Sequence, residues 1–359
     1  MIVFLALAGI FLLLPFVGWL WGPEANPKAE NRPLAEMPEF ALDEEFPAAF
    51  GQHFSDQFGW RQSMVRWQNI FREKVFGASD FENVLLGTDG WMFYQGGGVL
   101  NDFRKTRSFS EKSLTKIREN LLAEQKELAA YNIPLLLSLP PNKMTVYGEY
   151  LPERVTIDGS QSRLDQLQEL LQSEPSLHFV DVRKRLISQA ETTQVFYRTD
   201  THWNDEGAYQ GYLLLAEKMK GWFPSMPILP RNLMKENQKF FCGDLSKFLA
   251  QGESRGEEVV RYELLYPPMP INRGIKGLEN VQYYLIRGRN PKGPRLLMFQ
   301  DSFGFAIDPY LASSCSEALF VFDHGSYPDL IKSFRPNIVV RQVVERQLFT
   351  LANYRDKKN

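Results

Sequence analysis

Apolar runs that alternate with helical segments constrain the fold of this chain more than any other feature. Leu, Ile, Val and Phe dominate five short runs: IPLLLSLPP (133–141), LHFVDV (177–182), PRLLMFQDS (294–302), ALFVFD (318–323) and NIVVRQVV (337–344). Segments with a helical pattern, near 110–131, 160–172 and 206–223, separate several of these runs. Strands that are apolar on both faces belong to a sheet covered by helices on each side. The pattern predicts an α/β three-layer sandwich with a mostly parallel sheet, and ligands near the carboxyl ends of its strands.

Two further regions complete the body of the chain. The apolar spacing over 46–77 predicts two amphipathic helices broken near Gly59, and VLLGTDGWMFY (84–94) predicts a β-hairpin with a tight turn at Thr88-Asp89-Gly90. Residues from about 224 to 292 form mixed short pieces rich in Pro, Gly and Tyr, which indicate an insertion with some β structure. We therefore expect one domain over 46–359 with an insertion at about 224–292.

The N-terminus carries no ionisable side chain before Glu24. The run MIVFLALAGIFLLLPFVGWLWGP contains about 20 apolar residues, enough to cross a hydrocarbon core as a helix, and Trp19 and Trp21 suit an interfacial aromatic belt. Neither a basic region before the run nor a clear cleavage site after it is present. We expect a transmembrane signal anchor over 1–22, followed by a stalk over 23–45 that is rich in Pro, Ala and Glu.

Charge and cysteine content narrow the function. The formal net charge of −2 gives no electrostatic reason to expect nucleic acid as a partner. The two cysteines, Cys242 and Cys315, form either one disulfide or two buried thiols. No CxxC motif or His/Cys cluster indicates a structural metal, and we expect no cofactor.

The stretch RTDTHWNDEGAY (198–209) places Asp200 two residues before His202. A carboxylate beside an imidazole holds one tautomer and stabilises the imidazolium that forms when the ring takes a proton. Such a base requires a nucleophile, and the strongest candidate is Ser302 in LLMFQDSFGFA, where a buried strand turns into a helix. Asp301 and Ser302 also suit a plain helix cap without chemistry. The pairing with the Asp-x-His motif favours a Ser-His-Asp triad.

At this point the sequence resembles a known family. The ordered segments are VLLGTDGWMFY (84–94), LPPNK (139–143), TDTHW (199–203), CGDL (242–245), FQDSFG (299–304) and VVERQL (343–348). They are similar to those of the SGNH-hydrolase-like proteins of the alginate O-acetyltransferase type (AlgJ/AlgX-like), over most of the chain from Phe46 onward. The resemblance implies an SGNH-hydrolase-like (flavodoxin-like) fold with Ser302 as nucleophile, His202 as general base and acid, and Asp200 orienting His202. Gln300 departs from the family, which usually has Gly before Asp-Ser.

The resemblance implies an O-acetyltransferase that passes acetyl groups through an acyl-serine to hydroxyls of an exported cell-surface polysaccharide. Its acetyl donor partner would be a multispanning membrane-bound O-acyltransferase. The protein would lie in the bacterial inner membrane as a single-pass protein, with its catalytic domain in the periplasm or outside the cell. A carbohydrate acetylesterase, and a non-catalytic glycan-binding or export-complex scaffold, are the alternatives, and Gln300 makes the scaffold plausible.

Four other residues are candidates for substrate binding. Trp203 either stacks on a sugar ring or packs beneath the triad, and Tyr94, like Trp91 on the same hairpin, suits sugar stacking. Asn142 and Lys143 follow a predicted strand, where they contact substrate or only form a turn and a surface ion pair. The Ser302 backbone N–H provides one oxyanion donor, and the second is either Asn142 or the backbone of 96–98.

Residues outside the motif pair are expected to be structural. His53, His178 and His324 lack a carboxylate at similar spacing, and His178 is expected to pack in the core. Glu345 and Arg346, which follow the last strand, are expected to hold the carboxyl edge of the sheet together as an ion pair.

Overall fold

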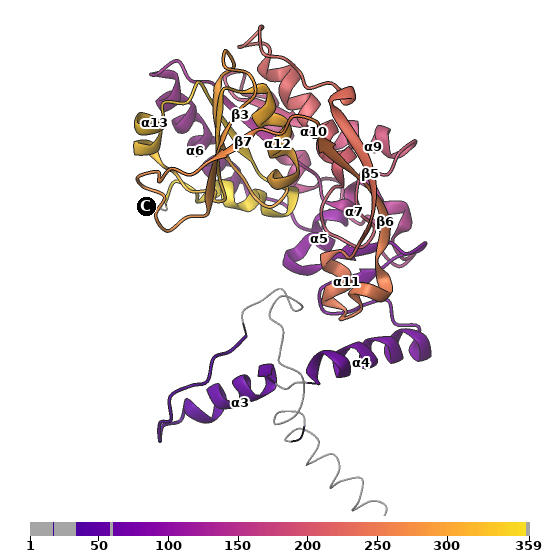
Figure 1. The fold of residues 1–359 in the computed structure, drawn as a ribbon. Helices are drawn as coiled ribbons and strands as arrows, with labels where there is room; N and C mark the ends of the chain where they lie inside the picture. The colour runs from indigo at the N-terminus through magenta and orange to yellow at the C-terminus, as the bar shows by residue number, and fades with distance from the viewer. Residues whose placement is uncertain (1–16, 18–33, 58–59, 357–359) are drawn as a thin grey trace, which may run out of the picture.

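A seven-stranded sheet in the order β4-β3-β11-β9-β10-β8-β7 forms the centre of the protein (Figure 1). The computed structural model describes Val17 and residues 34–57 and 60–356. Neighbouring strands from β4 to β10 are parallel, and β8 and β7 extend the sheet antiparallel. The predicted mostly parallel α/β sheet is therefore confirmed. The strands are β3 (Leu135–Leu139), β4 (His178–Asp181), β7 (Met269–Ile271), β8 (Tyr283–Arg287), β9 (Arg295–Phe299), β10 (Glu317–Val321) and β11 (Ile338–Gln342).

Helices cover both faces of this sheet because successive strand residues point to opposite sides. In β9, Leu296 and Met298 pack with one layer, and Leu297 and Phe299 pack into the clusters on the other face. The first layer consists of α9 (Arg183–Ala190), α10 (Asp205–Met219) and α12 (Gly304–Ser314). The second consists of α6 (Glu111–Ala129), α8 (Arg163–Gln172), α13 (Pro328–Phe334) and the 3₁₀ segment η5 (Glu345–Ala352).

Two β-hairpins lie outside the central sheet. The first pairs β1 (Val84–Leu86) with β2 (Met92–Tyr94), as the sequence predicted. The second pairs β5 (Met234–Phe241) with β6 (Glu257–Leu264), and α11 (Asp244–Phe248) and η4 (Gly252–Arg255) lie between its strands in the chain. The remaining short helices are η1 (Gly96–Gly98), α5 (Val99–Phe103), α7 (Lys143–Val146), η2 (Gly148–Tyr150) and η3 (Arg231–Leu233).

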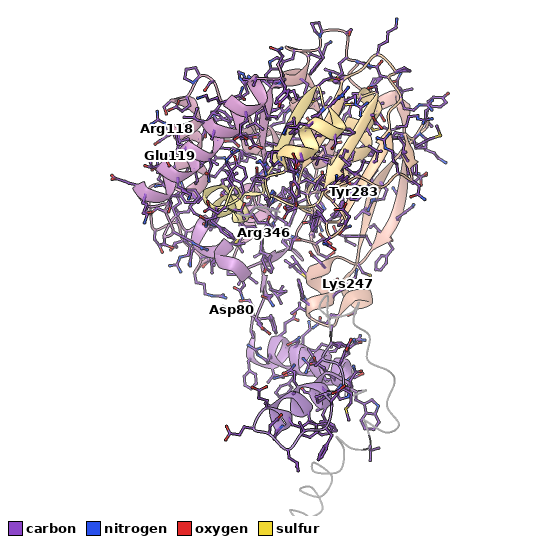
Figure 2. All side chains as sticks on the ribbon, turned by 90° about the vertical axis from the view of Figure 1, so that its left-hand side faces the viewer. Asp80, Arg118, Glu119, Lys247, Tyr283 and Arg346 are labelled. Carbon is purple, nitrogen blue, oxygen red and sulfur yellow. The ribbon has the colours of Figure 1, made fainter. Side chains whose placement is uncertain are left out.

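Two helices precede the body, α3 (Phe46–Gln57) and α4 (Arg61–Phe76). They agree with the two helices predicted over 46–77, and both figures show them set apart from the sheet and its covering helices (Figures 1 and 2). Three polar side chains connect α4 to the body: the Asn69 amide donates to the Leu249 carbonyl, Glu73 pairs with Arg255, and Arg72 donates to the Asp80 carbonyl and lies over the Phe81 ring.

None of the helices within residues 34–57 and 60–356 combines the length and apolar character that a bilayer-spanning helix requires. The anchor predicted for 1–22 lies outside the described residues apart from Val17, and the predicted stalk is described only from residue 34. Cys242 and Cys315 are both free thiols, which decides the question left open by the sequence against a disulfide.

Candidate active site

The side chains of Ser302, His202 and Asp200 form a continuous chain of contacts. His202 Nε2 lies 2.7 Å from Ser302 Oγ, and His202 Nδ1 lies 2.7 Å from Asp200 Oδ1. An ionised carboxylate only accepts hydrogen bonds, so Nδ1 carries the ring proton and leaves Nε2 free to accept from the serine hydroxyl. Two segments that are 100 positions apart thus meet in the order required for proton transfer.

Ser302 lies in the turn between β9 and α12, at the carboxyl end of its strand. Asp301 holds this turn: Oδ1 accepts the Phe303 N–H at 3.0 Å, and Oδ2 accepts the Val344 N–H at 2.7 Å. Because β11 runs parallel beside β9, the chain after β11 reaches the same edge of the sheet. Among the described residues, no hydrogen bond uses the Ser302 backbone N–H, which stays available next to the hydroxyl.

Lys143 stabilises the loop that carries Asp200. Its Nζ donates to the carbonyls of Tyr197 (3.0 Å), Arg198 (3.0 Å) and Asp200 (2.6 Å), and it lies 5.8 Å from the Trp91 ring centre. Burial lowers the pKa of Lys143 to about 8. Lys143 is buried, and its ammonium group, bound to three carbonyls, has no donor left for substrate. The substrate contact expected for Lys143 is therefore replaced by a structural role.

Asp244 and Glu257 hold the same loop from the β5–β6 side, and neither was predicted from the sequence as a site residue. Asp244 accepts the Thr201 N–H at 2.8 Å, and its own N–H donates to Asp200 Oδ2 at 2.9 Å. Glu257 accepts the Thr199 N–H and hydroxyl, each at 2.8 Å. The CGDL segment was the available signal for Asp244. Its Gly243 is needed for space, because a Cβ there would lie 2.1 Å from the Thr199 carbonyl oxygen.

The pKa values of the two carboxyl groups beside His202 are shifted in opposite directions. Burial opposes ionisation of Asp200, but the hydrogen bond and charge of His202 outweigh it, so the pKa of Asp200 is lowered. Burial and the nearby charge of Asp200 raise the pKa of Asp244. Asp200 is therefore the carboxylate that stays ionised against the imidazole.

Asp200, His202 and Asp244 also place potential metal-ligating atoms within 4.8 Å of one another. These atoms already have partners: Asp200 Oδ1 faces His202 Nδ1, and Asp244 Oδ2 accepts the Thr201 hydroxyl at 2.6 Å. A cation would have to break both interactions. The donor set therefore fits proton transfer better than metal binding.

Glu345 and Arg346 do not form the expected ion pair. Glu345 Oε2 instead accepts the Asn142 N–H at 2.8 Å and the Thr145 hydroxyl at 2.6 Å, and burial raises the pKa of this carboxyl. The Asn142 side chain is buried, without a hydrogen-bond partner in the described structure, and it does not line the pocket beside Ser302. The Asn142 backbone is therefore bonded to Glu345, which follows β11, and the substrate contact expected for the Asn142 side chain is not seen.

A pocket of about 750 Å³ opens beside Ser302 and His202. Tyr94 and Arg346 line it, together with an aromatic wall of Phe241, Phe248, Phe305 and Phe322. Tyr94 thus lies where a substrate contact is expected. Trp203, only 1% exposed, donates its indole N–H to the Phe303 carbonyl, which favours packing beneath the site over sugar stacking. Trp91 is also buried, stacked on Tyr147 with ring centres 4.1 Å apart.

Gln300 points away from this pocket. Its amide donates to Asp308 Oδ2 at 2.8 Å and to the Tyr284 hydroxyl at 3.2 Å, inside the layer of α12 and β8. The larger side chain is therefore accommodated behind the turn, where a Cβ on Gly304 would lie 2.3 Å from it.

The three other histidines lie outside the Ser302–His202–Asp200 chain. His324 is half-buried, with Nε2 3.1 Å from Gln347 Oε1 and 3.8 Å from Asp301 Oδ2. His178 is half-buried against the Trp222 ring, so the expected core packing is only partial. His53 contacts the Ala35 carbonyl in the N-terminal region.

Comparison with known proteins now identifies the family. The model of the SGNH hydrolase-like domain of the acetyltransferase AlgX matches residues 84–263, which is half of the chain. The protein belongs to this family. The matched part of this AlgX-family protein includes Asp200, His202 and Asp244, and Ser302 lies beyond it.

Individual relatives are distant. A probable alginate O-acetylase, AlgJ of Azotobacter vinelandii, is 24% identical over 207 residues, 57% of this chain and 50% of that protein, so the match spans about half of the relative's length. A DHHW family protein of Eubacterium siraeum superposes with a TM-score of 0.55 at 18% identity, over 76% of this chain and 93% of that one. Bacillus cereus PatB1, solved with a sulfonyl adduct, gives 0.56 at 14% identity, over 77% and 98%. These two structures share the overall fold of this chain, which the family model describes as SGNH hydrolase-like.

Proposed function

We propose that this AlgX-family protein is a polysaccharide O-acetyltransferase that uses Ser302, His202 and Asp200 as a catalytic triad. The observation that carries the proposal is the unbroken contact chain from Ser302 Oγ through His202 to Asp200, with 2.7 Å at each step. That order of groups supports acyl transfer through a covalent serine ester. Family membership and the relationship to a probable alginate O-acetylase support acetyl as the group transferred.

The first half-reaction acetylates the serine. His202 Nε2 takes the hydroxyl proton as Ser302 Oγ attacks the acetyl carbonyl of the donor ester. The tetrahedral intermediate collapses, the donor oxygen leaves, and His202 returns the proton to it. In the second half-reaction, His202 removes the proton of a sugar hydroxyl, whose oxygen attacks the acetyl-serine, and the proton then returns to Ser302. Asp200 stabilises the imidazolium in both halves.

Two groups beside Ser302 suit the oxyanion of the tetrahedral intermediate. The Ser302 backbone N–H is free of hydrogen bonds within the described residues. Arg346 lines the same pocket and forms no ion pair in the described structure, and its guanidinium lies 5.2 Å from the centre of the Phe303 ring. Burial lowers the pKa of Arg346, but an arginine guanidinium keeps its proton in proteins. Arg346 is therefore our candidate for the second oxyanion donor, in place of Asn142 or the 96–98 backbone.

The remaining parts of the proposal concern location and partners. The uncharged run at the N-terminus supports a single-pass anchor in the bacterial inner membrane, with a stalk over 23–45 and the catalytic domain in the periplasm or outside the cell. A membrane-bound O-acyltransferase would then supply acetyl groups, and an exported polysaccharide would receive them.

Acetylation of Ser302 tests the proposal directly. The full chain in detergent is incubated with an activated acetyl ester and analysed by intact and peptide mass spectrometry. We expect an acetyl adduct on the Ser302 peptide, its loss in Ser302→Ala, and transfer to an added oligosaccharide. Ser313→Ala, a serine on α12 away from the pocket, is the control and should keep the adduct. Release of free acetate without transfer would indicate an esterase, and no adduct at Ser302 would indicate a non-catalytic scaffold.

A further inference from the structure

Helix α4 exposes a continuous apolar stripe. Met64, Trp67, Phe71 and Val75 follow one another at the i, i+3 and i+4 spacing that places residues on one helix face. Their side chains are 52%, 69%, 56% and 59% exposed. Soluble surfaces rarely gather large apolar residues in this way, so such a patch indicates a contact made outside the described chain.

The opposite face of α4 is fixed to the body. Asn69 is buried and donates to the Leu249 carbonyl, and Glu73 pairs with Arg255. At about 100° per residue, Asn69 and Glu73 lie roughly opposite the stripe residues Trp67 and Phe71. Figure 2 shows the two N-terminal helices beyond the end of the body that carries Asp80 and Lys247. The stripe therefore faces away from the protein.

Charge and chain context indicate a lipid surface. Helix α4 carries four basic residues, Arg61, Arg66, Arg72 and Lys74, and a single acidic one, Glu73, which is already paired. A basic amphipathic helix with Trp and Phe on its apolar face is typical of helices that lie in the plane of an anionic membrane interface. The uncharged run that ends at Pro23 lies 38 positions before Arg61 in the sequence, so a membrane anchored there would be within reach of α4.

We propose that α4 lies in the membrane interface, with Met64, Trp67, Phe71 and Val75 in the lipid and its basic side chains near anionic headgroups. The proposal rests on the proposed membrane anchor, and it adds a second, in-plane contact. It also links the membrane to the site. Helix α11 provides Asp244 and Phe248 to the pocket, and the next residue, Leu249, accepts the hydrogen bond from Asn69 of α4. The in-plane helix would thus hold the Ser302 pocket at a fixed height and orientation above the bilayer.

A depth measurement on the full chain tests the proposal. The chain is placed in nanodiscs that contain phosphatidylglycerol, in a Cys242→Ser background in which the remaining thiol, Cys315, is buried. The environment-sensitive fluorophore NBD is attached at Phe71→Cys, or at Phe240→Cys on β5 as a matched control, since the two positions are 56% and 57% exposed. Because the apolar face of an interfacial helix lies about 5–10 Å into the headgroup boundary, we expect nitroxide-labelled lipid to quench NBD at 71 roughly twofold or more relative to 240.

Each alternative outcome has a distinct meaning. Equal quenching at both positions would overturn the docking of α4. A blue-shifted but unquenched label at 71 would mean that protein, such as a second copy of the chain, covers the stripe, and it would also overturn the lipid proposal. Failure of the chain to enter nanodiscs would overturn the anchor and the docking together. The acetyl adduct on Ser302, measured on the same samples, reports separately on the proposed enzyme activity.

A paired substitution provides a second test. Trp67→Glu with Val75→Glu should remove the quenching at position 71 and leave the rate of Ser302 acetylation by a soluble ester unchanged, because neither side chain lines the pocket. Unchanged quenching in this variant would contradict the assignment of the stripe to the lipid contact.

Discussion

Asp301 and Val344 are joined by a 2.7 Å hydrogen bond although 43 positions separate them in the chain. The bond connects the turn that carries Ser302 to the segment after β11 that carries Arg346. Since the second oxygen of Asp301 accepts the Phe303 N–H, a single buried carboxylate fixes both sides of the pocket edge. The position of the proposed nucleophile relative to the proposed oxyanion donor therefore depends on this residue.

Asp301→Asn should disturb that arrangement, because an amide has one acceptor oxygen where the carboxylate uses two. One buried N–H then loses its partner, at a cost of about 1–3 kcal/mol in the free energy of unfolding. We also expect a lower kcat for acetyl transfer. Urea unfolding and steady-state kinetics measure the two effects.

The control is Asp323→Asn, the same substitution at a carboxylate that accepts the Gly325 N–H and the Tyr327 hydroxyl through one oxygen, Oδ2. Because one amide oxygen can keep both of these contacts, this variant should leave stability and kcat nearly unchanged. An equal loss of kcat in both variants would contradict the positioning role of Asp301.

Asp200→Asn and Asp244→Asn should differ strongly in their effect on catalysis. Asp200 holds the Nδ1 proton of His202, and an amide at that position favours the wrong tautomer, so kcat should fall roughly 10³- to 10⁴-fold. Asp244 contacts Thr201 and has a raised pKa, so Asp244→Asn should lower kcat by only about tenfold or less. Steady-state kinetics of both variants tests this order, and the reverse order would assign the orienting role to Asp244.

The environment of Lys143 leads us to expect that activity falls at alkaline pH. Its ammonium binds three carbonyls, and the neutral amine that forms above its pKa of about 8 has only two N–H donors. We expect kcat/KM to fall above pH 8 as the Asp200 loop loosens. Because the folded pKa lies below the unfolded value of 10.5, the unfolded chain binds more protons between these pH values, and the contribution of this group to stability rises with pH there.

The measurement is a pH–rate profile together with urea unfolding from pH 7 to 10.5. In Lys143→Met both pH effects should disappear, whereas Lys247→Met, at an exposed lysine of the neighbouring helix α11, should keep them. An alkaline limb that survives in Lys143→Met would assign it to another group.

The fold and the central residues of the candidate site could be predicted from the sequence for a physical reason. The central strands β9 and β11 are largely apolar, so hydropathy alone indicates a parallel sheet covered by helices on both faces. Residues that follow parallel strands meet at one edge of such a sheet. Ser302 follows such a strand. The Asp-x-His spacing is local, because Asp200 reaches His202 within one turn of the backbone.

The supporting residues were not predictable in the same way. A lysine after a predicted strand is expected in an exposed turn. Burial of Lys143 is favourable only because three carbonyls from 197–200 accept hydrogen bonds from its ammonium group. Glu257 reaches Thr199 because the β5–β6 hairpin folds against the loop, and no local pattern encodes that contact across 58 positions. Arg346 was expected to pair with its neighbour Glu345, but Glu345 lies buried against Asn142 instead.

Asp308→Asn should stabilise the protein at neutral and alkaline pH. Burial raises the pKa of Asp308 well above its usual value, so the folded state favours the protonated carboxyl. Stability from this group is therefore greatest below the unfolded pKa near 3.8 and decreases as pH rises toward the folded pKa. An amide keeps an acceptor for the Gln300 side chain and does not ionise.

The gain in the free energy of unfolding should therefore be larger at pH 8 than at pH 5, because ionisation of the carboxylate in the folded protein is opposed by burial. Thermal and urea unfolding at the two pH values measure it. Asp329→Asn, at a fully exposed carboxylate on α13, should give no such gain. A loss of stability at pH 8 in Asp308→Asn would show that the ionised carboxylate is accommodated after all.

Arg346→Met should lower kcat far more than it raises KM. If the guanidinium stabilises the oxyanion, it acts in the transition state, and removal of one such donor lowers kcat about 10²- to 10³-fold. Arg346→Lys should recover only part of the loss, because lysine offers a point charge without the planar fork. The matched control is Arg261→Met, since Arg261 lines the same pocket but is already paired with Asp205 at 3.1 Å. Steady-state kinetics with an activated acetyl ester separates the two arginines. A rise in KM at constant kcat in Arg346→Met would instead assign Arg346 to ground-state binding of the substrate.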